Sequence, residues 1–524
     1  METLTKKVQT KFFENKILLL IFLIGFAFRL VMIGNIPGNT SIYQDEAFAA
    51  YESYSMLNYG TDSHGYVFPV YLKTWGSGMS IMQSLCMMPF IAIFGLNSFS
   101  ARLPQGILGC LTLVAFYFLY KRLRNKKESI LATFIFAIIP WHVMMSRWAL
   151  DCNYFPAFLL FGMLFLLKSE DNPKWLVLSA FFYGCSLYCY AAAWVVMPIM
   201  LLISFIYMTY KKAISLNKYS IISFFILALM ATPLLLFVAV NAGIIPEIRT
   251  NIISIPKLSH FRGDDVSLNA KLVLQRFYET FVMFVNQDDG RISNAPTNFG
   301  LYYKFSNIFI IIGIGSSIYD ILKKKEHSND IVVFSQLIAG IILGGLIEVV
   351  FNRINIIHIP MIYFLCVGLW TVIEFFGDKI LYAIIGLYSF SAIAFASYYV
   401  TVHDDFIAQV NYDGITTALQ ALQEEDIEAV HILSTSELKH AYILYSVAYP
   451  TNLYKETVVF KDVNAIAMDP LYFEGYDYTA TTSDTPISGD AYVCVDTDID
   501  STQYMQDNDM EITYYNHVVV GIAK

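Results

Sequence analysis

Long apolar runs separated by short polar clusters dominate the first 400 residues of the chain. A helix of about 20 such residues spans the hydrocarbon core of a bilayer. We interpret about eleven runs as spans. They are residues 17–33, 103–120, 130–145, 156–167, 176–190, 194–207, 219–240, 301–322, 331–350, 359–376 and 380–400. The pattern therefore predicts a polytopic α-helical membrane protein.

Basic clusters fall on alternate loops between these runs. Four lysines precede the first run, and further clusters follow residues 120, 207 and 322. Because excess Lys and Arg stay on the cytoplasmic side, we expect these clusters inside and the intervening loops outside. Two of the outer loops are long, residues 34–100 and 241–300.

The pattern changes after residue 402. Residues 403–524 contain 21 Asp or Glu, four Lys and no Arg, a net charge of −17, whereas the whole chain carries −9. Short apolar segments here predict strands, and two amphipathic segments predict helices. The strands are expected at 427–433, 457–460, 491–495 and 517–522, and the helices at 415–424 and 437–448.

These features predict two domains. Residues 1–402 would form the membrane domain, and residues 403–524 an acidic extracytoplasmic α/β domain, because the loop parity places the tail outside. We expect a multi-pass protein of the cell membrane with membrane lipids as partners. Nothing favours a nucleic acid, since the basic residues gather where lipid headgroups and the cytoplasm would meet them.

The pair Asp45-Glu46 follows the first apolar run closely. Two adjacent carboxylates beside a bilayer are costly to desolvate, which points to a use for their charge. A carboxylate at this depth can act as a general base toward an acceptor. The alternative is that either residue only caps the helix expected over residues 47–56.

The same loop holds three further candidates, His64, Tyr71 and Lys73, within a stretch rich in Gly and aromatic residues. Such a stretch is typical of a loop that lines a pocket. Lys73 is the only Lys or Arg between residues 33 and 102, and its charge can hold a phosphate. Snorkelling of the lysine from an interfacial helix is an equal alternative.

Three charged residues are expected in other outer turns. Arg147 and Asp151 lie four residues apart, either as an ion pair that orients two spans or as a pair that positions a lipid phosphate or steadies the carboxylates of the first loop. Arg353 follows a span and precedes His358, so it is a candidate phosphate clamp at headgroup level.

The sequence leaves metal ligands unassigned. His64, His260 and His358 lack ligand spacing, although convergence in space would leave a divalent metal open. No Walker motif or dinucleotide fingerprint appears, which argues against a nucleotide as the direct donor. A high-energy donor for an outer site would then be one that the membrane delivers.

Four short motifs, in this order, resemble those of a known family. They are Gln44 to Phe48, Ser98 to Pro104, Ser146 to Trp148 with Asp151, and Asn352-Arg353 ahead of Pro360. Together they resemble the GT-C glycosyltransferases, in the branch of the protein O-mannosyltransferases and lipid A aminoarabinose transferases (glycosyltransferase family 39 and relatives). The resemblance covers roughly residues 15–375.

The resemblance implies roles for individual residues. Asp45 would be the catalytic base, Glu46 would help to position acceptor or donor, and Lys73 and Arg353 would contact the phosphate of a polyprenyl-phosphate sugar. The sequence departs from the family at residues 67–73, where many relatives carry a Pro-Pro or Lys-Pro-Pro element.

The hypothesis is an inverting glycosyltransferase of the cell envelope, which moves a hexosyl or pentosyl group from polyprenyl phosphate to a protein, glycan or lipid acceptor outside. The alternative is a non-enzymatic lipid or glycan transporter. A transporter should carry charges midway through its spans. Here the charges singled out above cluster in outer loops, and Glu348 lies late within a span, which favours the enzyme.

Overall fold

The computed structural model describes residues 2–324, 327–434 and 437–524. The internal contacts of the chain divide it into two compact units. The helical unit contains residues 1–31, 105–232 and 265–398, and the mixed unit contains residues 32–104, 233–264 and 399–524. The boundary at residue 402, inferred from composition, stays a prediction.

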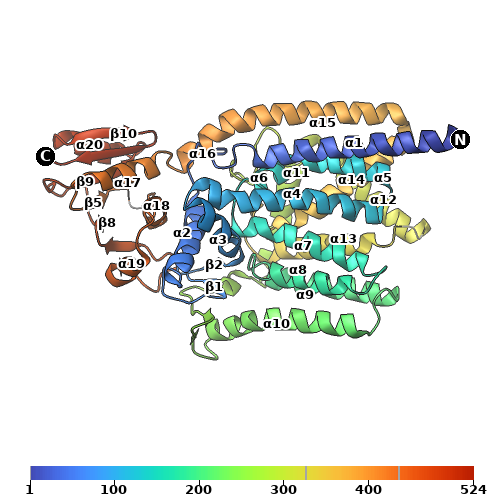
Figure 1. The fold of residues 1–524 in the computed structure, drawn as a ribbon, viewed down its shortest axis with the longest axis horizontal. Helices are drawn as coiled ribbons and strands as arrows, with labels where there is room; N and C mark the ends of the chain where they lie inside the picture. Colours follow the sequence, from blue (N-terminus) through green and yellow to red (C-terminus); the bar gives the residue numbers. More distant parts are fainter. Residues whose placement is uncertain (1, 325–326, 435–436) are drawn as a thin grey trace. The chain divides into compact units, whose positions relative to one another are not determined.

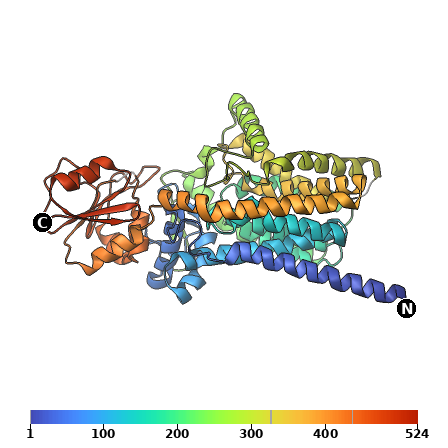
Figure 2. The same cartoon turned by 90° about the horizontal axis from the view of Figure 1, so that it is seen from above.

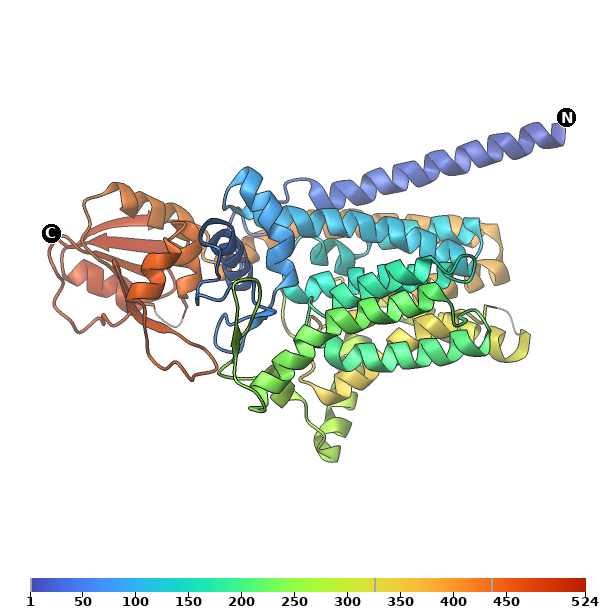
Figure 3. The same cartoon turned by 60° about the horizontal axis from the view of Figure 1, so that its bottom comes forward.

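The helical unit is a bundle whose long helices run alongside one another (Figures 1 and 3). Two helices, α4 and α10, contribute to both units. The elements of the bundle are α1 (Glu2–Leu30), α4 (Ser98–Leu123), α5 (Lys126–Ile138), α6 (Pro140–Met145), α7 (Asp151–Lys168), α8 (Trp175–Ser186), α9 (Ala193–Tyr210), α10 (Lys218–Asn241), α11 (Ala270–Asn286), α12 (Asn307–Tyr319), α13 (Asp330–Leu346), α14 (His358–Phe376) and α15 (Asp378–Tyr398), with short 3₁₀ or π turns at Lys304–Ser306, Asp320–Lys324 and Asn355–Ile357. A further π turn, Tyr399–His403, belongs to the mixed unit.

Seven helices in the described part of the chain are long and apolar enough to cross a membrane, and three shorter helices are also apolar. The seven are Ser98–Leu123, Asp151–Lys168, Ala193–Tyr210, Lys218–Asn241, Lys304–Lys323, Asn355–Phe376 and Asp378–Val410. These helices confirm the predicted class, a polytopic helical membrane protein. The count of eleven spans stays a prediction.

The run at residues 130–145 was expected to be one helix, and this expectation is wrong. Ile139 is extended, with φ −74° and ψ 134°, and it separates α5 from α6. Pro140 opens α6. Proline disfavours helical backbone in the residue before it and cannot donate to the preceding turn.

Helices α12 and α14 approach each other without intervening side chains. A Cβ atom on Gly313 would lie 1.8 Å from the carbonyl oxygen of Phe364, and one on Gly368 would lie 1.8 Å from that of Phe309. Only glycine therefore allows the two backbones to pack at this distance, and each helix supplies one.

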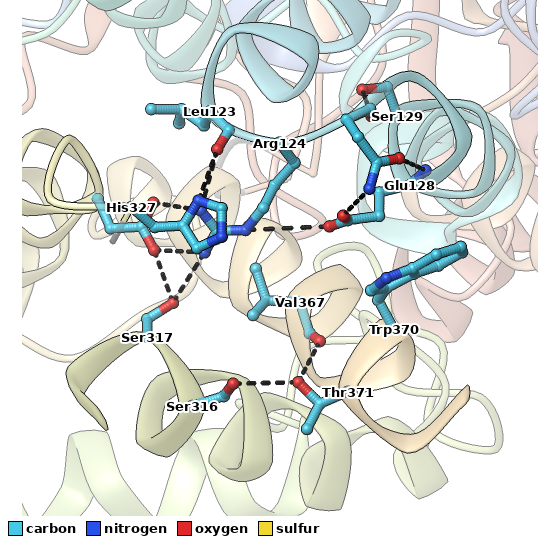
Figure 4. A network of polar contacts seen from close by, with 12 residues as sticks. Leu123, Arg124, Glu128, Ser129, Ser316, Ser317, His327, Val367, Trp370 and Thr371 are labelled. Atoms are coloured by element: carbon cyan, nitrogen blue, oxygen red, sulfur yellow. Dashed lines mark hydrogen bonds and ion pairs between the residues drawn. The ribbon is translucent and has the colours of Figure 1, made fainter. Parts of the chain in front are cut away.

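A buried polar network ties one end of four helices together (Figure 4). Arg124 at the end of α4 donates to Asp330 of α13 at 3.0 Å. Ser317 of α12 and Tyr363 of α14 each donate to the same carboxylate at 2.7 Å. Because Asp330 is fully buried, these donors compensate the loss of its hydration.

The mixed unit contains α2 (Gln44–Tyr59), α3 (Met82–Phe94) and two short ribbons, formed by β1 (Tyr71–Leu72) with β2 (Met79–Ser80) and by β3 (Ile248–Arg249) with β4 (Ser254–Ile255). A 3₁₀ turn covers Arg262–Asp265. The helices of its C-terminal part are α16 (Asp404–Val410), α17 (Ile415–Glu424), α18 (His440–Ser446), α19 (Thr451–Thr457) and α20 (Ile499–Asp507).

Seven strands form one sheet in the order β10-β11-β9-β5-β8-β7-β6, and β5 is parallel to both β9 and β8. Helix α20 lies against one face and α17 against the other (Figure 2). The strands are β5 (Val430–Ile432), β6 (Val459–Phe460), β7 (Pro470–Phe473), β8 (Tyr476–Asp477), β9 (Ala491–Val495), β10 (Glu511–Tyr515) and β11 (Val518–Ile522).

Helix α2 joins the N-terminal and C-terminal parts of the mixed unit. It is buried along most of its length and packs against α3 and α18. Tyr51 donates its hydroxyl to the carbonyl oxygen of Tyr449 at 2.8 Å, and Ser84 of α3 donates to that of Ala49 at 2.9 Å. The helix that carries Asp45-Glu46 is thus part of a packed core.

Candidate active site

The carboxylates of Asp45 and Glu46 lie in the first turn of α2, where the partial positive charge of a helix start favours them. Glu46 also accepts a hydrogen bond from the backbone nitrogen of Tyr43 at 3.2 Å. The capping role that the sequence offered as an alternative is therefore present for Glu46. Asp45 is partly exposed, whereas Glu46 is fully buried.

Glu46 forms a buried ion pair with Arg102 of α4. The guanidinium donates to both carboxylate oxygens, at 3.1 and 3.0 Å. It also donates to the carbonyl oxygens of Pro37 and Ser41, each at 2.9 Å. Arg102 thus fixes both the start of α2 and the loop that leads to it, and Glu46 acts as its counter-charge.

The other carboxylate has an aromatic partner. Trp75 donates from Nε1 to Oδ1 of Asp45 at 3.3 Å. The indole packs edge-on against Phe48, with ring centroids 4.4 Å apart, and His440 of α18 packs against both rings. Oδ1 of Asp45 is therefore held beside a cluster of rings, and the side chain remains partly open to solvent.

A second pair of carboxylates lies deeper in the unit. Glu52 accepts from the backbone nitrogen and hydroxyl of Ser63, at 2.8 and 2.5 Å. Asp62 accepts from the backbone nitrogens of His64 and Tyr66, at 3.0 and 2.8 Å. Burial, and then the charge of Asp62, raises the pKa of Glu52, and burial raises the pKa of Asp62.

The mixed unit also contains the three loop candidates. The His64 ring stacks on that of Phe460, with centroids 6.2 Å apart. Burial, and then the charge of Lys73, lowers the pKa of His64 to about 3, so the ring is neutral near pH 7. Tyr71 is buried in β1, with its ring 5.1 Å from that of Phe237. Lys73 follows β1 and is partly buried.

The remaining candidates belong to the helical unit. Arg147 donates to the carbonyl oxygens of Phe28 and Val31, at 3.0 and 2.8 Å, and so satisfies the C-terminal end of α1. Asp151 opens α7 and accepts from the backbone nitrogen of Cys152 at 2.7 Å. Arg353 donates to Glu348 at 2.6 Å and is about one-third exposed.

Sequence reasoning missed Trp75, His440, Glu52 and Asp62. Arg102 stood within a recognised motif but was given no role. The signal for Arg102 was its place in the Arg-Leu-Pro segment at the start of an apolar run, where an arginine needs a partner. No local pattern points to His440, because its contacts with α2 join residues almost 400 positions apart.

The described residues contain no group of three or more His, Cys, Asp and Glu side chains arranged to hold a metal ion. His64 and His358 belong to different units. All seven cysteines are free thiols. Among these described residues the protein groups do not form a recognisable metal site.

The comparisons with known proteins agree with the family resemblance inferred from the sequence. The family model for dolichyl-phosphate-mannose-protein mannosyltransferases matches residues 80–237. No curated protein matches the sequence. ArnT from Cupriavidus metallidurans bound to undecaprenyl phosphate has a similar fold, with a TM-score of 0.56, 10% identity and 98% of each chain covered.

The oligosaccharyltransferase of Archaeoglobus fulgidus is a second structural relative. Its complex tethered with an acceptor peptide gives a TM-score of 0.53 and 14% identity over 84% of this chain, and its complex with Zn and sulfate gives 0.51 and 16% over 82%. The chain spans less than two thirds of that protein, 63% and 61% in the two matches. At such identities the structural matches establish the fold alone. With the family-model match, they confirm the resemblance of this chain to the GT-C glycosyltransferases.

Proposed function

We propose that the protein is a glycosyltransferase that moves a sugar from a polyprenyl phosphate to an acceptor on the outer face of the membrane. The observation that carries the proposal is the geometry of Asp45. This carboxylate is partly exposed at the start of a buried helix, held at one oxygen by Trp75 and adjacent to an ion pair that fixes the helix.

The proposed reaction is a direct displacement with inversion at the anomeric carbon. Asp45 removes the proton of an acceptor hydroxyl, and the oxygen forms a bond to the anomeric carbon. The bond from that carbon to the phosphate oxygen breaks, and the lipid phosphate leaves with the electron pair. A phosphate leaving group needs little acid assistance, so a base and cations suffice.

Each of the two units contains residues that we propose as contacts of the sugar donor. Lys73 is the proposed phosphate contact of the mixed unit, with His64 and Tyr71 beside it in the same loop. Arg353, Arg147 and Asp151 are the proposed donor contacts of the helical unit. Glu46 would act indirectly, because its carboxylate is engaged by Arg102.

The relatives support a lipid-linked donor. One ArnT structure is bound to undecaprenyl phosphate, and one oligosaccharyltransferase structure holds dolichol phosphate with an inhibitory peptide. For this chain the donor class is therefore a polyprenyl-phosphate sugar. The acceptor is a hydroxyl of a protein, glycan or lipid, and the extracytoplasmic location of residues 403–524 is part of the proposal.

The test is transfer by the purified protein in liposomes, with a panel of polyprenyl-phosphate sugars. Asp45→Asn should reduce transfer by about 10²–10⁴-fold, because the amide is no base. Asp405→Asn is the matched control, since Asp405 is also the second residue of a helix, α16, and is exposed. Near-normal transfer by Asp45→Asn would exclude Asp45 as the base. Movement of the lipid across the bilayer without transfer would favour a transporter instead.

A further inference from the structure

The C-terminal part of the chain reaches the candidate base. We infer that His440 and the segment Ala465–Met468 position the active site by holding Trp75 against Asp45. The inference rests on the proposed function of Asp45. It gives residues 403–524, which carried no recognisable motif, a place in the reaction as a positioning device rather than as a separate module.

The backbone of Trp75 is in a conformation that its side chain does not favour. Its φ is +65°, in the left-handed region that bulky residues rarely adopt. Such conformations persist only where the surrounding structure enforces them, and they cluster at functional sites. Contacts that hold Trp75 in this left-handed conformation are therefore expected around residues 73–78.

The C-terminal segment supplies those contacts. The backbone nitrogen of Met468 donates to the carbonyl oxygen of Trp75 at 3.0 Å, and Gly76 forms a β-bridge with Ala467. A Cβ atom on Gly76 would lie 2.6 Å from the carbonyl oxygen of Ala465, so the two backbones touch. Residue 75 is thus clamped by a segment that lies almost 400 positions away in the sequence.

His440 completes the clamp at the side chain. Its ring centroid lies 5.8 Å from that of Trp75 and 4.9 Å from that of Phe48. The residue is 3% exposed, and its Nδ1 has no hydrogen-bond partner among the described residues. Burial lowers the pKa of His440 to about 3, so the ring is neutral. The ring therefore acts here through its shape rather than through charge.

A surface ion pair links His440 and the segment Ala465–Met468, the two parts of the clamp on Trp75. Lys439, next to His440, donates to Asp469 at 3.1 Å, and Asp469 follows Met468. Together the two parts leave the indole N–H of Trp75 directed at Oδ1 of Asp45. A carboxylate whose oxygen is already held loses less rotamer entropy when it engages an acceptor. This lowers the barrier of the chemical step.

Four variants test the inference in the full-length protein: Trp75→Phe, His440→Ala, His440→Phe and the control His517→Ala. Trp75→Phe keeps a ring and removes the donor, so we expect kcat to fall about tenfold with the donor KM unchanged. His440→Ala should lower kcat similarly, and His440→Phe should restore it to within about threefold. His517 lies elsewhere in the C-terminal part, paired with Asp496, and its variant should behave as wild type.

Hydrogen exchange tests the clamp without turnover. Amides of residues 73–78 should exchange about tenfold faster in His440→Ala than in wild type, and at the wild-type rate in His440→Phe and His517→Ala. Unchanged exchange in His440→Ala, or equal kcat losses in His440→Phe and His440→Ala, would overturn the inference. If exchange changes as expected but Asp45→Asn still transfers sugar, the clamp exists and the proposed base is wrong.

Discussion

Arg102 donates to both carboxylate oxygens of Glu46, and the two side chains are 1% and 0% exposed. A buried pair of this kind gains little over an apolar pair of the same size. Removal of one partner is costly, however, because it leaves the other charge buried and uncompensated. Replacement of either residue should therefore destabilise the start of α2 and disturb the position of Asp45.

Arg102→Met should lower the free energy of unfolding by about 3–5 kcal/mol, since buried Glu46 loses the counter-charge that Arg102 supplies. The measurement is thermal unfolding of the purified protein in detergent. Arg122→Met is the control, because Arg122 forms ion pairs with Glu170 and Asp171 at the surface. Such exposed pairs contribute about 0–1 kcal/mol. Equal unfolding midpoints for the two variants would contradict the expectation.

The raised pKa values of Glu52 and Asp62 predict that the stability of the folded protein depends on pH. Because burial raises both pKa values in the folded protein, the folded protein binds more protons than the unfolded chain. The stabilisation that these two groups give the folded state is complete below about pH 4, where ordinary carboxyl groups titrate. It is lost as the pH rises through the raised pKa values of the folded protein.

Glu52→Gln should weaken this dependence, because the amide does not titrate. We expect the unfolding midpoint of the wild type to fall more between about pH 5.5 and about pH 8.5 than that of Glu52→Gln. The variant keeps a polar group beside Ser63, which limits other changes. Parallel pH profiles for the two proteins would show that Glu52 ionises normally.

Arg353 and Glu348 provide a test of the proposed phosphate contact. The ion pair between them is partly exposed, so Glu348 would compete with the proposed donor phosphate for the guanidinium. Glu348→Gln should therefore lower the donor KM several-fold, and Arg353→Lys should raise it by about one decade, because lysine lacks the two-pronged geometry. Donor titrations of transfer give both values. If neither variant changes the donor KM, Arg353 serves the structure alone.

Topology is tested by cysteine labelling in intact cells. Glu424→Cys on α17 should react with an impermeant thiol reagent, because the charge parity predicts that the C-terminal part lies outside. Lys174→Cys, in the loop between the spans expected at residues 156–167 and 176–190, is expected inside and should react only after lysis. Six of the seven native cysteines are buried, which keeps background labelling low. The reverse order of labelling would invert the proposed orientation.

Local patterns predicted much of the secondary structure. The amphipathic segment 415–424 forms α17 with the same bounds, and residues 491–495 form the buried strand β9. Both signals lie within the segment itself, as helical spacing or as a short apolar run, so they need no knowledge of the fold. A short ribbon strand was missed before α3, because two residues carry too little periodicity.

The surroundings of Asp45 were less predictable. The Asp45-Glu46 pair is visible in the sequence, and its position after an apolar run suggests a site. Its partners are Trp75 and Arg102, and His440 packs on Trp75 and Phe48 beside it. Only the folded chain brings these residues together. Composition also marked residues 403–524 as distinct by charge, but charge does not reveal that α18 packs on α2.

The glycine contacts between α12 and α14 limit how the bundle can move. Two backbones in direct contact at Gly313 and Gly368 have no side-chain layer that can shear or repack between them. The pair should therefore translate as one piece during any rearrangement that admits or releases a lipid. Motion within the bundle would then fall to helices that meet through side chains, which can change rotamer as they slide.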